Sequence, residues 1–244
     1  MDMKNKTDLE SCKTVAKLFL ELDIIADPTF GEMIVHHPFF NSPMSIDRKG
    51  NLCSFMDNHD ALIEAKEKMK SKINKVEKFQ DFSMILNKPY LLAFLKYTHF
   101  YLSKEDLSKF LSEAWTRMEF PNNDSTLTKT EAISLFKQCD PTHMMDDSEL
   151  TAYERLPEKI KVYRGVKKNL DYKALSWTLD KDVAKWFSLR FTDKGIVYEA
   201  EIKKEDVFAV FMNRGEQEIV LNYKKLENVR SLIQSKRQKD DLMR

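Results

Sequence analysis

Glycine is scarce in this chain. Only 5 of the 244 residues are glycine, and they lie far apart in the sequence. Dinucleotide-binding turns of the Gly-x-Gly-x-x-Gly type and phosphate-binding P-loops need several glycines within a few residues, because their backbone must come close to phosphate groups. Neither motif occurs in the sequence. Nucleotide binding through a glycine-rich loop is therefore excluded.

Cysteine is also sparse. Cys12, Cys53 and Cys139 are an odd number of widely spaced residues without a Cys-x-x-Cys pair, which argues against both a disulfide framework and a zinc site. Residues 1–8 are polar and lack the apolar core of a signal peptide. Together these observations predict a cytoplasmic protein in a reducing environment.

A charge excess of one sign and long apolar runs are absent as well. Lys and Arg (40) nearly balance Asp and Glu (39), so the net charge of +1 gives no overall field that favours nucleic acid or a membrane. The most apolar stretch, residues 90–102, contains Lys96 and is too short to span a bilayer. It predicts a buried helix, and no membrane partner is expected.

Histidine offers little catalytic or metal-binding material. The chain has 5 histidines, and His36, His37 and His59 match no established ligand spacing. Surface or capping roles are the simpler interpretation of these residues. No metal is expected, and no Ser–His–Asp set can be identified.

The apolar residues recur with helical spacing up to residue 156. Val15, Leu18, Phe19 and Leu22 fall on one face of a helix. Residues 30–58 are irregular and contain several proline and glycine breakers. Further helical stripes and N-capping patterns predict helices that begin near Leu62, Pro89, Ser103, Thr128 and Asp146.

Beyond Pro157 the period changes to the alternation of strands. Strands are predicted at residues 159–164, 174–178, 195–202, 207–211 and 218–221, with one helix capped by Asp180 after the second strand. The predicted fold class is α+β, with a helical N-terminal region (1–156) packed on a mixed, mainly antiparallel sheet (157–235). A charged tail (236–244) is expected to fray.

Three short motifs lie in this β-rich part. They are Arg164-Gly165 at the end of a β-branched run, Ser176-Trp177-Thr178, and Glu216-Gln217-Glu218. Each is weak alone, since a surface Arg before a turn glycine, routine strand hydroxyls and a solvated pair of carboxylates are common. Ala184-Lys185-Trp186-Phe187 follows on a predicted helix, which Arg190 ends.

Taken in this order, the motifs resemble the Arg–Ser–Glu signature of the mono-ADP-ribosyltransferase superfamily, in particular its bacterial and phage-type members. These enzymes cleave NAD at the nicotinamide–ribose bond and pass ADP-ribose to an acceptor. The resemblance covers about residues 156–221. It implies an ADP-ribosyltransferase core with NAD as substrate and no metal.

The resemblance also implies a role for each residue. Arg164 would bind phosphate or ribose oxygens through its forked guanidinium, and the Gly165 backbone would hold the nicotinamide amide. Ser176 would orient the essential glutamate, Glu218, which would stabilise the positive charge that develops on the ribose.

Further roles belong to neighbouring residues. Glu216 would engage the acceptor nucleophile, and its closeness to a second carboxylate suits a general base. Thr178 shares the strand face of the serine. Phe187 is a candidate nicotinamide contact, although buried packing is the simpler interpretation. Arg190 is a candidate phosphate contact, with the alternative of a cation favoured at a helix C-terminus.

The acceptor stays open at this point. Protein arginine or a base of RNA or DNA are both compatible with the motifs. By resemblance, an intracellular toxin or phage-defence effector is expected, which implies a neutralising antitoxin partner. Two alternatives from other classes are a NAD glycohydrolase, in which water replaces the acceptor, and a non-catalytic nucleotide-binding interaction module.

Overall fold

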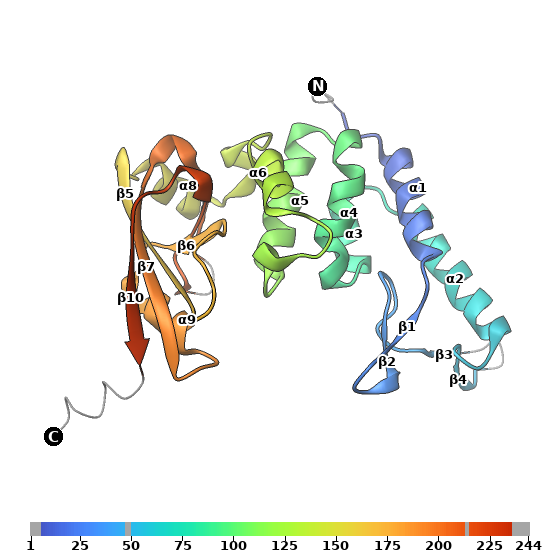
Figure 1. Cartoon of the computed structure of the whole chain (residues 1–244). Helices are drawn as coiled ribbons and strands as arrows, with labels where there is room; N and C mark the ends of the chain where they lie inside the picture. Colours follow the sequence, from blue (N-terminus) through green and yellow to red (C-terminus); the bar gives the residue numbers. More distant parts are fainter. Residues whose placement is uncertain (1–5, 47–49, 213–214, 236–244) are drawn as a thin grey trace. The chain divides into compact units, whose positions relative to one another are not determined.

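A computed structural model describes residues 6–46, 50–212 and 215–235 of the chain (Figure 1). The tail 236–244 therefore lies outside the described residues. The chain divides into two compact units, Met1–Leu127 and Thr128–Arg244. The fold is mixed α and β, and its main sheet lies in the C-terminal unit.

The boundary between the units differs from the one that the sequence pattern indicated at residue 156. The helices α6 (Lys129–Phe136), α7 (Pro141–Met144) and α8 (Asp147–Glu154) belong to the C-terminal unit. The reason is side-chain packing, because the ring of Phe136 on α6 stacks on Phe208 of strand β8 (Val207–Phe211), with ring centroids 5.6 Å apart. Helical periodicity marks these segments as helices but does not show which neighbours they pack against.

The N-terminal unit is mainly helical. Its elements are α1 (Leu9–Leu20), β1 (Ile25–Asp27), β2 (Gly31–His36), β3 (Met44–Ile46), β4 (Leu52–Ser54), α2 (His59–Asn74), α3 (Phe82–Ile85), α4 (Leu91–Thr98) and α5 (Lys104–Arg117). The segment that the sequence leaves irregular forms two small antiparallel hairpins, β1–β2 and β3–β4.

The predicted buried face of α1 is partly wrong. The residues that α1 buries are Cys12, Ala16 and Leu20, whereas Leu18 is 65% exposed. Leu22 lies beyond the end of the helix. The helix turns its row of small side chains inward, since Cys12 and Ala16 allow a closer approach to its neighbours than leucine does.

Aromatic rings make up the centre of the N-terminal unit. Phe79 contacts Phe110 with ring centroids 4.7 Å apart, and Phe82 contacts Phe94 at 4.9 Å. The helix α4 is buried along most of its length, as predicted. The predicted stripe on α5 is confirmed, because all of its members are buried: Leu107, Phe110, Leu111, Ala114 and Trp115.

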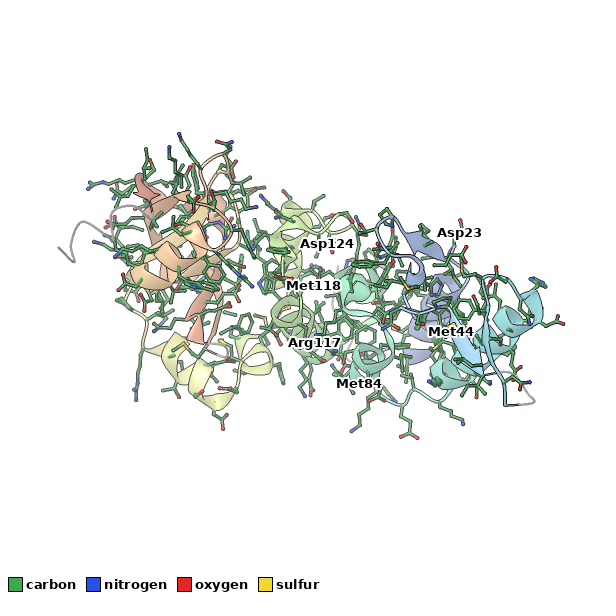
Figure 2. All side chains as sticks on the ribbon, turned by 90° about the horizontal axis from the view of Figure 1, so that it is seen from below. Asp23, Met44, Met84, Arg117, Met118 and Asp124 are labelled. Atoms are coloured by element: carbon green, nitrogen blue, oxygen red, sulfur yellow. The ribbon has the colours of Figure 1, made fainter. Side chains whose placement is uncertain are left out.

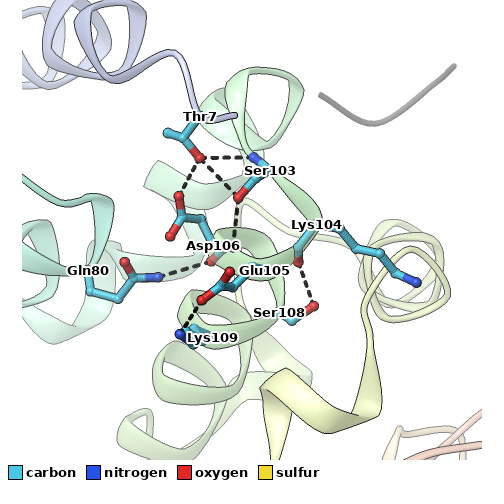
Figure 3. Close-up of polar contacts among 8 residues, drawn as sticks. All are labelled: Thr7, Gln80, Ser103, Lys104, Glu105, Asp106, Ser108 and Lys109. Carbon is cyan, nitrogen blue, oxygen red and sulfur yellow. Dashed lines mark hydrogen bonds and ion pairs between the residues drawn. The ribbon is translucent and has the colours of Figure 1, made fainter. Parts of the chain in front are cut away.

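The start of α5 is held by Thr7, a residue near the N-terminus of the chain (Figure 3). The Ser103 side chain accepts from the amide of Asp106 at 3.1 Å, which is the predicted N-cap. The reciprocal part of the cap runs through Thr7. Its hydroxyl accepts from the Ser103 amide at 2.9 Å and donates to the Asp106 carboxylate.

The other end of α5 is tied to α3. Arg117, labelled in Figure 2, donates through Nη1 to the Ser83 carbonyl oxygen at 2.9 Å and to the Glu113 carboxylate at 2.8 Å. The guanidinium thereby supplies a hydrogen-bond donor to a backbone carbonyl oxygen of the short helix α3. Both ends of α5 are thus bound to other parts of the N-terminal unit.

The C-terminal unit contains a sheet of six strands. They are β5 (Lys159–Lys167), β6 (Ser176–Thr178), β7 (Lys194–Lys203), β8 (Val207–Phe211), β9 (Glu218–Leu221) and β10 (Glu227–Ser235). Their order across the sheet is β10-β7-β5-β6-β9-β8, and every neighbouring pair is antiparallel. The five predicted strands are confirmed, and β10 is an additional edge strand that the sequence pattern did not predict.

Helix α9 (Lys181–Leu189) packs on this sheet over two glycines. A Cβ atom at Gly165 on β5 would lie 1.7 Å from the Ala184 carbonyl oxygen, and one at Gly195 on β7 would lie 2.2 Å from that of Ser188. Only glycine leaves room for such a close helix–sheet contact. Asp180 caps this helix as predicted, with its carboxylate accepting from backbone amides of the first turn.

No helix in the described part of the chain has both the length and the apolar character needed to cross a membrane.

Candidate functional site

Three neighbouring strands carry the three motifs. Arg164 lies on β5, Ser176 on β6 and Glu218 at the start of β9, and these strands are adjacent in the sheet. Tyr163 pairs with Thr178, which in turn pairs with Glu218. Residues more than 50 positions apart in the sequence therefore come together across two strand spacings, which are about 5 Å each.

Strand alternation assigns these residues to different faces. Directly paired residues point to the same side of a sheet, so Thr178 and Glu218 share the face of Tyr163, as does Ser176 two residues along β6. Arg164 follows Tyr163 and leaves β5 on the opposite face, where its partner on β7 is Tyr198. The motifs meet at the same place in the sheet, but not on one flat face.

The Arg164 guanidinium nevertheless reaches the backbone of the neighbouring strand β6. Its Nη1 atom donates to the backbone carbonyl oxygen of Ser176 at 2.5 Å. Its Nε atom is buried and has no hydrogen-bond partner in the described part of the chain. A buried donor without an acceptor costs about 1–3 kcal/mol, more when it is charged. The site thus holds a cationic group with one donor still to be satisfied.

Electrostatics tie Arg164 to two carboxylates. Burial lowers the pKa of the Arg164 guanidinium to about 10, and the charges of Glu218 and Asp171 act in the opposite direction by raising this pKa. The group remains a cation at neutral pH. The influence of Glu218 means that its carboxylate lies within electrostatic range of the guanidinium.

The turn before β9 has an unusual backbone. Gln217 adopts φ 43°, in the left-handed region that few residues other than glycine enter. The turn is held by two bonds: the Thr178 hydroxyl donates to the Glu216 carbonyl oxygen at 2.7 Å, and the Leu179 amide donates to that of Gln217 at 3.2 Å. Such strain persists where the surroundings enforce it, often at functional sites.

The backbone at Gln217 also determines how the two glutamates are related. The strand begins at Glu218, so Glu216 precedes it and does not share its face through regular strand alternation. Asn213 and Arg214, which precede Gly215 and this motif, lie outside the described residues.

Sequence reasoning missed Glu149, a buried acidic residue that binds the backbone just after β8. Its side chain is 4% exposed, and its Oε1 atom accepts from the Met212 amide at 3.0 Å, just after β8. The Oε2 atom accepts from the Asp146 amide at 3.2 Å and completes the capping box of α8. The capping pattern was visible in the sequence, but its link to β8 was not.

A second group that the sequence did not reveal lies next to Arg164. The Tyr198 ring contacts the Tyr172 ring with centroids 5.4 Å apart, and the Tyr198 hydroxyl donates to the Leu170 carbonyl oxygen at 3.4 Å. These contacts attach the segment between β5 and β6, which also contains Asp171, to the strand that pairs with Arg164.

The remaining predicted residues lie on or under α9. Gly165 has a packing reason, because α9 occupies the space where its side chain would be. Phe187 is half-buried, and its ring meets the ring of Trp186 edge-on at 4.9 Å. Arg190 follows the last turn of α9, and its guanidinium lies over Trp186 and Phe191.

Two of the three histidines considered for a metal have other partners. His36 bonds to the Asp27 carboxylate at 2.9 Å, and the His37 ring stacks on Phe40 with centroids 4.9 Å apart. Among the residues that the structure describes, no group of three or more His, Cys, Asp or Glu side chains is arranged to hold a metal ion.

No protein-family model, curated protein or solved structure matches this chain.

Proposed function

We propose that this protein is a mono-ADP-ribosyltransferase that uses NAD and modifies a macromolecular acceptor. The observation that carries the proposal is the environment of the Arg164 guanidinium. This group is buried and bonds to the Ser176 carbonyl oxygen, and the charge of Glu218 raises its pKa. Its buried Nε–H donor has no partner among the described residues. A buried cation with an open donor is suited to an anionic ligand.

The residues present fit NAD as a substrate. Arg164 supplies a permanent cation and a forked set of donors for phosphate or ribose oxygens. Ser176 and Thr178 lie on the strand between the cation and the glutamate, and the Thr178 hydroxyl anchors the turn that carries Glu216. The group therefore combines phosphate recognition with an acidic turn at one place in the sheet.

The proposed chemistry follows from these charges. The bond between nicotinamide and ribose breaks, and its electron pair leaves with the nicotinamide. Glu218 stabilises the positive charge that develops on the ribose, and the acceptor nucleophile forms the new bond at the same carbon. Glu216 takes the proton that the acceptor releases. Removing one group of this kind typically lowers the rate by about 10²–10³.

The strained turn supports the division of labour between the two glutamates. Because Gln217 is held in the left-handed region, strand alternation does not direct Glu216 and Glu218 to the same side. One carboxylate can then face the ribose while the other faces the acceptor. A regular extended strand would direct both carboxylates to the same side.

The test is incubation of the full chain with NAD labelled in its adenylate part, together with a cell lysate. The wild type should label a macromolecule, and Glu218→Gln should lower the labelling rate by about 10²–10³ with unchanged circular dichroism. Glu205→Gln, an exposed glutamate of the same unit, is the matched control. Full activity in Glu218→Gln would refute the site.

Product analysis separates the proposal from the two alternatives. Free ADP-ribose with no labelled macromolecule would identify a glycohydrolase. Binding of NAD without turnover, unaffected by Glu218→Gln, would identify a non-catalytic module. Separate protease and nuclease digestion of a labelled product then identifies the acceptor class.

The biological setting belongs to the proposal through the resemblance alone. A toxin or defence effector should arrest the growth of cells that express the wild type, whereas Glu218→Gln should be tolerated. A partner that neutralises the wild type would restore growth. Normal growth with an active wild-type enzyme would leave the enzyme proposal intact and remove the toxin role.

A further inference from the structure

The way α9 sits on the sheet determines which of its residues face solvent. Ala184 and Ser188 rest over the two glycines of β5 and β7 and are completely buried. Residues 186 and 190 lie on the other side of the helix and are one turn apart. Trp186 is accordingly 56% exposed, and Phe191, after the helix, is 61% exposed. Two large aromatic side chains therefore stand in water at one end of α9.

These rings are stacked with cations. The Arg190 guanidinium carbon lies 5.1 Å from the centroid of Trp186 and 4.8 Å from that of Phe191. The Lys167 ammonium, at the end of β5, lies 5.7 Å from the Phe191 centroid. We call Trp186, Arg190, Phe191 and Lys167 the aromatic–cation patch. Its planar groups are ordered by one another rather than by burial.

The surrounding charge is positive. Residues 167–168 and 190–194 contribute Lys167, Lys168, Arg190 and Lys194, against one carboxylate, Asp193. The pairing of Lys167 with Gly195 brings the two segments to the same end of the sheet. This charge is local, because the chain as a whole is almost neutral. It favours a polyanionic ligand at this end of the unit.

We propose that the aromatic–cation patch binds single-stranded nucleic acid. Unpaired bases stack on exposed aromatic rings and on arginine planes, while neighbouring cations contact the phosphates. An acidic protein would use the charge but has no need of two exposed rings. A duplex hides the base faces that the rings would contact. The binding does not depend on NAD cleavage; if the proposed function holds, it names a nucleic acid as the acceptor class.

The first test uses the wild-type chain alone. Trp115 and Trp177 are 1% and 3% exposed, so Trp186 is the tryptophan that a ligand can reach. Oligo(U) and oligo(dT) of about 12 nucleotides should quench the tryptophan emission, and Trp186→Phe should abolish that quenching. A comparison of the two oligomers distinguishes RNA from DNA. Absence of quenching and of any anisotropy change, up to about 10⁻⁴ M protein, would overturn the proposal.

The second test measures affinity by anisotropy of labelled oligomers. Trp186→Ala and Phe191→Ala should each weaken binding about tenfold, and Arg190→Gln should lower the slope of log affinity against log salt by about 0.7. Phe120→Ala, an equally exposed ring of the other unit (54%), is the matched control. Unchanged affinity in both patch variants, or equal competition by polyglutamate, would overturn the proposal.

Glu218→Gln keeps this inference separate from the proposed function. The variant should bind the oligomers with wild-type affinity although it lacks transferase activity. Oligomer binding by a chain with no NAD activity would therefore support the patch and reject the enzyme. Labelled protein acceptors without oligomer binding would do the reverse.

Discussion

The two units of this protein treat buried polar groups differently. In the N-terminal unit, the hydroxyls of Thr98 and Ser108 are completely buried, and each donates at 2.7 Å to a carbonyl oxygen one turn earlier in its own helix. In the C-terminal unit, acidic and basic groups are buried as well, besides the neutral side chains of Thr178, Ser188 and Asn222. Glu149 is 4% exposed, and Arg164 keeps an enclosed nitrogen without a partner.

The difference bears on the proposed site. A hydroxyl that bonds within its own helix is satisfied locally and needs no distant partner. A buried charge is costly and rarely adds stability compared with an apolar side chain of the same size. Its presence is better explained by a ligand or by the positioning of a site. The buried charges of the C-terminal unit therefore support the proposal that the functional site lies there.

The largest expected effect is the loss of an aromatic ring from the N-terminal core. Phe94 is completely buried and contacts Phe82 and Phe79. Phe94→Ala should lower the free energy of unfolding by about 3–5 kcal/mol, and hydrogen exchange should become faster in residues 6–127 only. Met84→Ala, at a residue 80% exposed and labelled in Figure 2, should change stability little. Equal acceleration in residues 128–235 would show that the units do not differ in this way.

The next effect tests the helix–sheet contact of the C-terminal unit. Gly165→Ala should lower the free energy of unfolding of this unit by about 3 kcal/mol, because the added carbon meets backbone atoms of α9 that cannot yield separately. Gly31→Ala is the matched control in the other unit. Its added carbon has nothing within 4 Å and only its positive φ is strained, so the expected cost is about 1 kcal/mol. Similar losses at both glycines would refute the packing argument.

The comparison also shows which features a sequence can predict. Helix α5 and its buried stripe, the capping box at Thr128 and the cap at Asp180 were predicted because their signals lie within one or two turns of chain. The assignment of helices α6, α7 and α8 to the C-terminal unit was not predicted, since it depends on contacts such as that of Phe136 with Phe208. Edge strand β10 was also missed, because most of its residues are polar and exposed.

The candidate site divides in the same way. The sequence identified Arg164, Ser176 and Glu218 as residues of interest, and the order of the strands brings them together. It did not identify the left-handed backbone at Gln217 or the bond from Glu149 to the residue after β8. Both are consequences of how distant segments meet, which local patterns do not contain.

The N-terminal unit also buries a titratable side chain, His37, and its effect on stability should depend on pH. His37 is 1% exposed; its Nδ1 accepts from the Phe39 amide at 3.1 Å, and burial lowers its pKa to about 4. The unfolded chain, with a histidine pKa of about 6.5, therefore binds the proton more readily than the folded chain. Stability should be full above pH 6.5 and fall by about 3 kcal/mol as pH drops toward 4.

Urea unfolding at a series of pH values, followed by exchange in residues 6–127, measures this loss. His37→Gln should remove most of the pH dependence between 6.5 and 4, whereas His59→Gln, at an exposed position, should retain it. The dependence of the free energy of unfolding on pH should be a property of the N-terminal unit. A slope that persists in His37→Gln would assign the effect to other groups.

The smallest expected change in stability concerns Glu149, the buried acidic residue of the C-terminal unit. Glu149→Gln leaves one oxygen to serve two amides, those of Met212 and Asp146, and should cost about 1–2 kcal/mol. The proposed role of Glu149 is to position the turn that carries Glu216 and Glu218. Exchange should therefore become faster at residues 212–218, and the turnover of NAD should fall severalfold with little change in KM.

A matched variant separates positioning from capping. Glu131 completes the capping box of α6 with its Oε2 atom at 2.8 Å from the Thr128 amide nitrogen, as Glu149 does for α8, but its capping bonds do not reach β8. Glu131→Gln should therefore reproduce the loss of a capping bond without faster exchange at residues 212–218 and without the fall in turnover. If both variants lower turnover equally, the buried carboxylate of Glu149 only stabilises its helix, and the charge that the C-terminal unit buries has a structural role at this position.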